Sequence, residues 1–427
     1  MGFQLDSIHA SAEGNPGLMG IVTAAAGRRD GYQVPVALAE AGLLSSHVTD
    51  LYLPDQLQPF LQELAQRSGS EQLRAVCMRH HPQLPSRLVH CSRRLLLTKT
   101  AQRLRPALSQ RWHDDQDPIS WSALRQAQCH ESALLLHMGY AHQAFMAEPR
   151  ERRRRGLVQY HPHIAESAKI LREDLARYPA LGDALDQLRI DVQDSSNDEE
   201  LERADLVVCN SKFTARTCVL LGVAEQKIRL IPFGINPPPP PLPRVSVSQS
   251  GSCHFLFVGS GIHRKGLHHL LEAWHLAGLK HSRLTLICRY IEPQLRSNFS
   301  LGDGVELRQA VTQRQLEQLY NSADVFVLPS MVEGFGYVYL EALARGCFCL
   351  GTPNTGLPDI ADPQSAKIVP AAQPSMLAVA LQNLETQAFV CGFDRDAIAA
   401  NAMQWSWPRF RNQLYLASEE VLLNTSS

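Results

Sequence analysis

The chain has 427 residues, 44% of them apolar and 19% charged, which is enough for two or three domains with well-buried cores. Its 41 basic and 42 acidic residues give a formal net charge of −1, which argues against a chain that binds polyanions over its whole surface. The ten cysteines lack metal-site spacing, no apolar run would span a bilayer, and the N-terminus does not read as a signal peptide, so we expect a cytoplasmic protein.

The first half of the chain predicts an α/β domain with a less regular order of elements. Its first predicted strand leads through a glycine-bearing loop into a helix, a turn typical of a strand end. Predicted strands cover 18–25, 133–138, 156–161 and 205–210, and predicted helical regions cover 34–44, 56–130 and 165–204. A helix that begins at Ser211 and one more strand close this domain.

A run of prolines, PPPPPLP at 237–243, marks the predicted domain boundary. Proline lacks a backbone N–H and fixes φ, so this run can join neither a sheet nor a helix and forms a stiff connector. We therefore predict an N-terminal domain at 1–238, a linker at 239–250, a C-terminal domain at 251–403 and a terminal helical segment at 404–427.

The second half of the chain alternates strands and helices regularly. Predicted strands cover 254–259, 283–289, 305–308, 325–329 and 347–351, and predicted helices cover 267–278, 314–323 and 337–346. This order favours a parallel, doubly wound sheet. In such sheets ligands bind at the carboxyl ends of the strands.

One candidate site follows the apolar strand at 325–329, in the segment EGFGYVYLEALARG at 333–346. Gly334 and Gly336 let the backbone turn and approach a ligand, and a helix follows them. Glu333 lies in the loop and Glu341 about one turn inside the helix. A single Glu in a helix is more typical of a solvated face, but two carboxylates at one strand-to-helix junction are suited to binding sugar hydroxyls.

A second candidate site lies in GSGIHRKGLHHLLEAW at 259–274, where a strand, a tight loop and an amphipathic helix follow one another. Arg264 and Lys265 stand just ahead of the helix. A planar guanidinium and a compact ammonium both suit phosphate oxygens, although a basic pair in a loop is otherwise often only solvated.

These two segments resemble glycosyltransferase family 4, the retaining glycosyl transferases group 1 with the GT-B fold. The family pattern EGFG-x4-EA-x-A-x-G is matched in full, and the RKG of the basic loop is kept, with Ser260 where an earlier Arg commonly stands. The resemblance is strong over 201–423 and positional over 17–200. It implies two Rossmann-like doubly wound domains facing across a cleft, with the C-terminal helix packing back on the first domain.

The resemblance also implies an activity and residue roles. The expected reaction is a hexosyl transfer from a nucleotide-diphosphate sugar to a polysaccharide or glycolipid acceptor. Arg264 and Lys265 would hold the diphosphate, the backbone at Gly334, Phe335 and Gly336 would assist, Glu333 would bind hydroxyls of the transferred sugar, and Glu341 would bind the ribose. Since Lys and Arg neutralise the leaving group and no D-x-D motif is present, no metal or other cofactor is expected.

Two residues of the first domain complete the predicted site. His161 ends the strand at 156–161, at a position where family members often have a His facing the cleft, so a role near the sugar or acceptor competes with a structural one. Gly31, or the nearby Gly27, would let the acceptor-side loop approach its ligand. The family often has paired glycines there, whereas three residues separate them here.

Two arginine-rich stretches, at 87–105 and 149–156, permit a peripheral contact with an anionic membrane or form solvated helix faces. Nucleic acid is not an expected partner, because aromatic residues are not interleaved with these charges. Three other functions compete with sugar transfer: a nucleotide-sugar epimerase of the same fold, a dinucleotide-dependent oxidoreductase, and a sugar-binding or scaffold protein without turnover. The oxidoreductase is disfavoured because Gly259, Gly261 and Gly266 do not form G-x-G-x-x-G.

Overall fold

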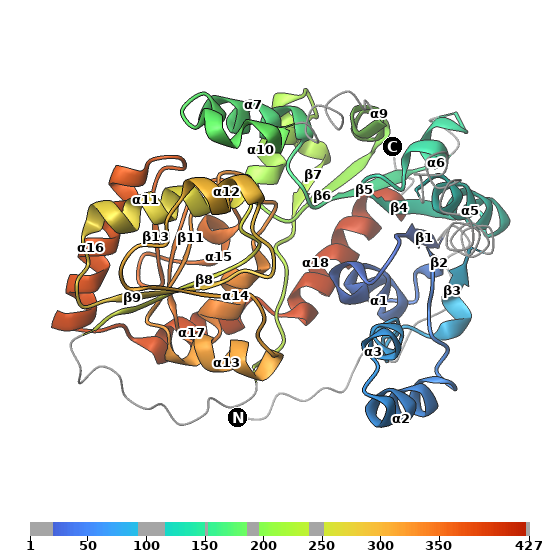
Figure 1. Ribbon diagram of the computed structural model, residues 1–427. Helices are drawn as coiled ribbons and strands as arrows, with labels where there is room; N and C mark the ends of the chain where they lie inside the picture. Colours follow the sequence, from blue (N-terminus) through green and yellow to red (C-terminus); the bar gives the residue numbers. More distant parts are fainter. Residues whose placement is uncertain (1–19, 93–115, 150–152, 186–195, 239–251, 424–427) are drawn as a thin grey trace, which may run out of the picture. The chain divides into compact units, whose positions relative to one another are not determined.

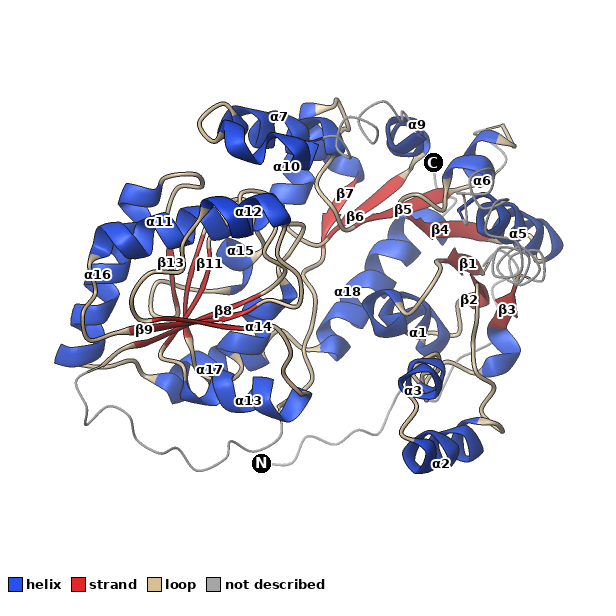
Figure 2. Ribbon diagram, in the orientation of Figure 1, coloured by secondary structure: helices blue, strands red, loops and turns tan. Residues whose placement is uncertain are grey.

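The computed structural model describes residues 20–92, 116–149, 153–185, 196–238 and 252–423 (Figures 1 and 2). The chain forms two compact units. The first consists of Met1–Leu136, Met146–Gly156 and Tyr415–Ser427, and the second of His137–Phe145 and Leu157–Leu414. The predicted linker at 239–250 lies outside the described residues.

The first sheet has seven strands in the order β3-β2-β1-β4-β5-β6-β7. β1 pairs in parallel with β2 and β4, β2 with β3, and β6 with β7. The strands are β1 (Ile21–Ala24), β2 (Leu44–Thr49), β3 (Val89–Cys91), β4 (Ala133–His137), β5 (Arg155–Gln159), β6 (Leu206–Cys209) and β7 (Ile228–Leu230).

The helices of this part of the chain are α1 (Gln33–Glu40), α2 (Gln58–Ser68), α3 (Glu71–Cys77), α5 (Gln116–Cys129), α6 (His142–Met146), α7 (Ile164–Leu175), α9 (Ser196–Arg203) and α10 (Lys212–Leu220). The prediction of a helical region over 56–130 is wrong at β3, and β2 was not predicted. β2 has the sequence LSSHVT, and its polar residues are not typical of the buried strand that it forms. They are tolerated because they are paired, as His47 Nδ1 is with Thr23 Oγ1 at 2.9 Å.

The second sheet has six strands in the order β10-β9-β8-β11-β12-β13, and every neighbouring pair is parallel. The strands are β8 (His254–Val258), β9 (Arg283–Ile287), β10 (Val305–Arg308), β11 (Val325–Leu328), β12 (Phe348–Gly351) and β13 (Ala366–Ile368). The chain moves outward from β8 through β9 to β10, then returns to β11 beside β8. β8 and β11 therefore flank the topological switch point, where ligands bind in such sheets.

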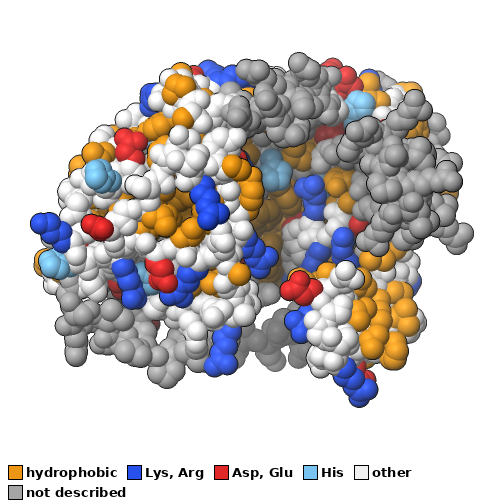
Figure 3. All heavy atoms as spheres, in the orientation of Figure 1, with side chains coloured by type: hydrophobic (Ala, Val, Ile, Leu, Met, Phe, Trp, Pro, Cys, Tyr) orange, Lys and Arg blue, Asp and Glu red, His pale blue; other side chains and the backbone are white. Residues whose placement is uncertain are grey.

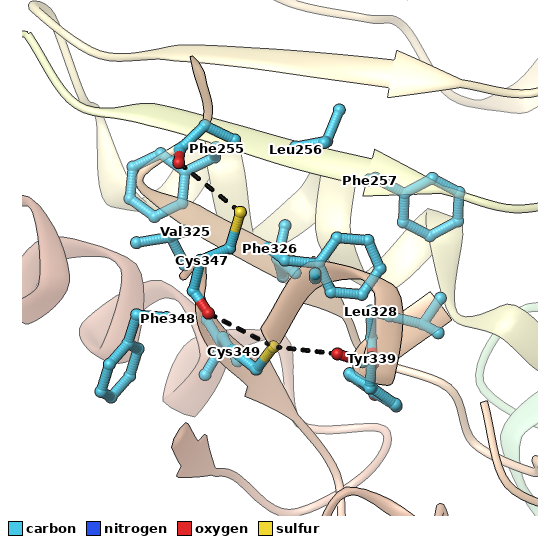
Figure 4. Close-up of a cluster of buried hydrophobic side chains, with 14 of the residues drawn as sticks. Phe255, Leu256, Phe257, Val325, Phe326, Leu328, Tyr339, Cys347, Phe348 and Cys349 are labelled. Atoms are coloured by element: carbon cyan, nitrogen blue, oxygen red, sulfur yellow. Dashed lines mark hydrogen bonds between the residues drawn. The ribbon is translucent and has the colours of Figure 1, made fainter. Parts of the chain in front are cut away.

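The core of the second sheet is apolar on both faces, as a parallel sheet covered by helices requires. Figure 4 shows aromatic side chains of β8, β11 and β12 around Phe326, with Phe255 and Phe257 on the neighbouring strand. The thiols of Cys347 and Cys349 are buried in this core and donate to backbone oxygens, and both cysteines are free.

Helices cover both faces of the second sheet (Figure 1). They are α11 (Leu267–Ala277), α12 (Pro293–Asn298), α13 (Gln313–Ser322), α14 (Tyr337–Leu343), α15 (Leu357–Ile360), α16 (Pro374–Val390) and α17 (Arg395–Met403). α18 (Trp407–Ser418) follows and continues as a π-helical turn over Glu419–Leu423. The strands and helices predicted between 254 and 351 are confirmed to within a few residues at each end, whereas α12, α15, α16, α17 and β13 were not predicted.

The two arginine-rich stretches have different outcomes. Residues 93–105 lie outside the described residues. In the second stretch, Arg155 is fully buried and donates to the carbonyl oxygens of Glu148 and Pro149, at 2.7 and 3.0 Å, while buried Arg153 pairs with the Glu148 carboxylate at 3.1 Å. These two guanidinium groups are therefore structural, and they do not face a membrane.

Charges on the face seen in Figure 3 are interspersed, with basic and acidic side chains scattered among neutral ones. This distribution agrees with the near-neutral balance of the sequence. Among the described residues, no helix combines the length and apolarity that crossing a bilayer demands.

Candidate functional site

Two loops meet at the switch point of the second sheet. The loop after β8 contains the short 3₁₀ helix His263–Lys265 and ends at Gly266, and the loop after β11 contains Glu333. The carbonyl oxygen of Arg264 accepts hydrogen bonds from the amides of Met331 and Val332, at 2.9 and 3.3 Å. The backbone of one loop thus holds the other in register.

Gly266 explains how closely these loops approach. Its φ of +68° lies in the left-handed region, and a Cβ at this position would stand 2.2 Å from the carbonyl oxygen of Pro329. Only glycine fits both the conformation and the contact. The RKG sequence is therefore needed for loop packing as well as for its two charges.

The two loops bring Arg264, Lys265 and Glu333 together. Oε2 of Glu333 accepts a hydrogen bond from Arg264 Nη1 at 3.2 Å and forms a short ion pair with Lys265 Nζ. The side chains of Lys265 and Glu333 are 13% and 12% exposed, and that of Arg264 is 40% exposed. Two of the predicted diphosphate ligands and the predicted sugar ligand thus form one cluster.

The electrostatics of this cluster are those of two cations that share one carboxylate. Burial acts to raise the pKa of the Glu333 carboxyl, but the charges of Lys265 and Arg264 outweigh it and hold that pKa below its usual range. Burial lowers the pKa of the Lys265 ammonium, against the opposing effect of Glu333, and nearby Arg264 lowers it further. An additional anion placed beside these two cations would therefore be stabilised.

The Glu333 loop is held in place at Gly334 by residues that the sequence analysis did not identify as part of a site. We call these contacts the Gly334 clamp. The carbonyl oxygen of Gly334 accepts hydrogen bonds from the hydroxyls of Ser211 and Thr214, at 2.5 and 3.3 Å. A Cβ on Gly334 would stand 2.1 Å from the carbonyl oxygen of Tyr160. The predicted helix start at Ser211 was correct, since its Oγ caps α10, but its second role was invisible in the sequence.

A third loop, after β12, supports the same segment. The amide of Glu333 donates to the carbonyl oxygen of Asn354 at 3.1 Å, and Asn354 Nδ2 donates to the carbonyl oxygen of Met331 at 2.8 Å. Phe335 buries its side chain in the core, so only its backbone is available for a ligand. Gly336, with a φ of +80°, precedes α14.

His161 lies beside the clamped loop. It is exposed, two residues beyond the end of β5, and its Cα would be 3.5 Å from a Cβ on Gly334. Its imidazole also contributes to the lowered pKa of Glu333. His163 is buried, caps α7 and contacts Asp198, so its role is structural.

Gly31 lies in the first compact unit, whereas the other predicted site residues lie in the second. It has a φ of +66° within a tight turn over Arg29–Tyr32, directly after the loop that follows β1. Gly27, four residues earlier, has a φ of +78° and donates its amide to Asp50 Oδ1 at 2.8 Å. Both positions thus have a left-handed backbone, which glycine adopts without strain.

Glu341 has a different partner from the cation cluster, which consists of Arg264, Lys265 and Glu333. Its Oε2 accepts a hydrogen bond from the Tyr320 hydroxyl of α13 at 3.0 Å. Burial raises the pKa of the Glu341 carboxyl, while the Tyr320 hydrogen bond acts in the opposite direction. Tyr320 is a positioning residue that the family pattern did not reveal.

We expect Tyr320→Phe to lower the free energy of unfolding by about 1.5 kcal/mol, because the charged carboxylate loses its hydrogen bond. This is the low end of the range for hydrogen bonds to charged groups, since Glu341 is only partly buried. Chemical denaturation measures the change. Tyr290→Phe, at a 54% exposed tyrosine, is the matched control and should leave the midpoint unchanged. Equal midpoints for the two variants would contradict the role given to Tyr320.

Comparison with protein families decides which family this geometry belongs to. The model of the family described as glycosyl transferases group 1 matches residues 252–387. We call residues 252–387 the group 1 domain after this match. The match contains the cation cluster and Glu341, and it confirms the family predicted from the sequence for this part of the chain.

Curated relatives match part of the chain at low identity. An uncharacterised glycosyltransferase of Methanocaldococcus jannaschii is 28% identical over 175 residues, which are 37% of this chain and 45% of that protein. A D-inositol 3-phosphate glycosyltransferase of Streptomyces coelicolor is 30% identical over 115 residues, 27% of this chain and 25% of that protein. The matched stretch thus spans less than half the length of these relatives.

Solved structures extend the likeness beyond the group 1 domain, as a likeness of fold. A glycosyltransferase of Rickettsia africae superposes with a TM-score of 0.58 at 14% identity, covering 96% of this chain and all of that one. The sucrose-phosphate synthase of Thermosynechococcus elongatus has a TM-score of 0.54 at 17% identity, covering 94% and 98%. Together with the two parallel sheets, these matches confirm the predicted GT-B fold class.

Proposed function

We propose that the chain is a retaining glycosyltransferase that moves a hexose from a nucleoside diphosphate sugar to an acceptor, without a metal ion in the transfer step. The observation that carries this proposal is the convergence of Arg264 and Lys265 on Glu333 at the switch point of the group 1 domain. The names of the relatives support the same reaction class.

The chemistry requires what this cluster offers. Cleavage of the anomeric C–O bond leaves positive character on the sugar and new negative charge on the departing diphosphate. Lys265 and Arg264 would share their contacts between Glu333 and the diphosphate oxygens. Glu333, relieved of part of its ion pairing, would then accept hydrogen bonds from hydroxyls of the transferred sugar.

The remaining predicted residues take supporting roles in this proposal. His161 borders the Glu333 loop and would contact the sugar or the attacking acceptor hydroxyl. Glu341, positioned by Tyr320, would accept hydrogen bonds from the ribose. Gly31 would belong to the acceptor side.

The comparisons suggest the first substrates to try. An Anabaena protein of similar fold was solved in complex with UDP, with a TM-score of 0.54 at 14% identity. A serotype-specific mannosyltransferase of Escherichia coli is 30% identical over 166 residues, 36% of this chain and 20% of that protein. We propose UDP-hexoses as the first donors, and acceptors of the polysaccharide or glycolipid type.

A donor panel tests the proposal. The unfolding temperature is measured with UDP-, GDP-, ADP- and dTDP-sugars, followed by assays of donor hydrolysis and of transfer to added sugars. A cognate donor at 100 times its dissociation constant should stabilise the fold by about 2.7 kcal/mol. Glu333→Gln should lose transfer, and Glu306→Gln, at an exposed carboxylate of β10, should retain it.

Three outcomes would contradict the proposal. A flat response to all nucleotide sugars would favour a scaffold protein, and binding without any transfer or hydrolysis would favour a sugar-binding protein. Conversion of the donor to its epimer in the absence of an acceptor would make the chain an epimerase. Full transfer by Glu333→Gln would remove Glu333 from the site.

A further inference from the structure

A buried carboxylate of α7 lies against three histidines of the group 1 domain. Asp174 Oδ2 is 2.8 Å from His263 Nε2 and 2.9 Å from His268 Nε2, and its Oδ1 is 2.9 Å from His269 Nε2. All four side chains are at most 4% exposed. These four residues, the Asp174 cluster, take no part in the proposed transfer.

Aromatic rings border the Asp174 cluster. The ring of Tyr178 stands edge-on to those of His268 and His269, with centroids 5.0 and 5.2 Å away, and Phe299 lies 5.8 Å from His268. Among the described residues, no Lys or Arg side chain forms an ion pair with Asp174. A buried carboxylate in such a place needs a compensating positive charge.

The imidazoles are incompletely satisfied by Asp174 alone. Nδ1 of His268 and Nδ1 of His269 are both buried without a hydrogen-bond partner. If each Nε2–H donated to Asp174, each ring would keep an unpaired lone pair at Nδ1, and such unpaired polar atoms are uncommon in protein interiors. Both rings therefore make their polar contacts through Nε2, on the side of Asp174.

We propose that Asp174, His268 and His269 bind a divalent transition-metal ion of the zinc class, which fixes α7 to the N-terminal turn of α11. One ligand atom from each residue lies within 4.8 Å of the others. Imidazole nitrogen and carboxylate oxygen are ligands that zinc prefers, and two ligands of a tetrahedral zinc lie about 3.3 Å apart. The observed separations of 2.9 Å need only a small opening.

His263 completes the arrangement as an orienting residue. Its Nε2 contacts the same Asp174 oxygen as His268 does, and its amide donates to Glu292 Oε2 at 2.8 Å. Carboxylates that bind metals are commonly held by such a hydrogen bond. Sequence spacing could not reveal this site, because Asp174 precedes His268 by 94 residues.

Metal content and stability test the site on the full chain, purified without a metal-affinity tag. Elemental analysis should find about one zinc-class ion per chain. Dipicolinate should then lower the unfolding temperature, and added Zn²⁺ should restore it. His269→Asn should lose the ion, and His275→Asn, at an exposed histidine of the same helix, should keep it.

Two results would overturn the site. The first is a wild-type chain that contains well under a tenth of an equivalent of metal ion and gains no stability from added Zn²⁺, Co²⁺ or Ni²⁺. The second is a His269→Asn variant that retains the ion, which would place the metal elsewhere. The add-back measurement on the wild type decides the question even where His269→Asn does not fold. Neither result depends on sugar transfer, so the metal site and the proposed function are tested separately.

Discussion

Lys265→Ala should lower kcat/KM for sugar transfer about a hundredfold to a thousandfold, the usual loss when one charge-stabilising donor is removed. Lys265 is largely buried between Glu333 and Arg264, so no surface cation could take its place readily. The departing diphosphate would lose the compact positive charge of the Lys265 ammonium beside it. Steady-state kinetics with the donor identified by the panel measure this effect.

Loss of activity through unfolding must be separated from loss of a phosphate ligand. Lys265→Ala leaves a buried Glu333 paired with Arg264 alone, so this variant should also be less stable than the wild type. In the double variant with Glu333→Gln, that unpaired carboxylate is gone. Its stability should recover relative to the sum of the single variants, while transfer stays low.

Lys280→Ala is the matched control, because Lys280 is an exposed lysine just beyond the C-terminal end of α11. It should transfer sugar at the wild-type rate. If Lys265→Ala were folded and equally active, diphosphate binding by the RKG loop would be refuted. If Lys280→Ala were as impaired as Lys265→Ala, the loss would not be specific to the cluster.

Gly334→Ala should destabilise the fold by about 1–3 kcal/mol, the usual cost of overpacking. The added Cβ would stand 2.1 Å from the carbonyl oxygen of Tyr160, and it would also crowd the Tyr160 carbonyl carbon at 3.2 Å. Both are backbone atoms, which cannot rotate away. The loop cannot retreat without losing the hydrogen bonds from Ser211 and Thr214 to the Gly334 oxygen.

The same substitution should impair transfer in the molecules that remain folded. Glu333 is next to Gly334, and a displacement of about 1 Å at a positioning residue can cost a hundredfold in rate. Thermal unfolding and kcat/KM, measured below the unfolding transition, separate the two effects. A stable Gly334→Ala with full activity would show that the clamp does not position Glu333.

Gly182→Ala provides the control for Gly334→Ala. A Cβ on Gly182 meets no atom within 4 Å, and its φ is not in the left-handed region. This variant should be as stable as the wild type. An equal loss of stability or of transfer activity in both variants would point to a general effect of replacing glycine.

The second half of the chain was predictable because its pattern is local. The apolar runs of β8, β11 and β12 alternate with amphipathic helices, and buried parallel strands need such runs. The full EGFG-x4-EA match and the retained RKG came from contiguous residues. Prediction failed where the strand pattern is interrupted by polar residues, as at β2, whose buried His47 needs Thr23 from β1 to be satisfied.

By itself the sequence predicted the group 1 family for residues 252–387, the GT-B fold class and the candidate cation and carboxylate residues, because each is encoded in a short contiguous pattern. Tertiary structure alone decided which partners these residues have. Both cations contact Glu333, and Tyr320 donates to Glu341. Tyr160 and Ser211 pack against Gly334, and three histidines contact Asp174. These partners come from separate elements, some about a hundred residues apart. Only strand order and loop packing bring them together, and no periodic pattern in the sequence predicts either.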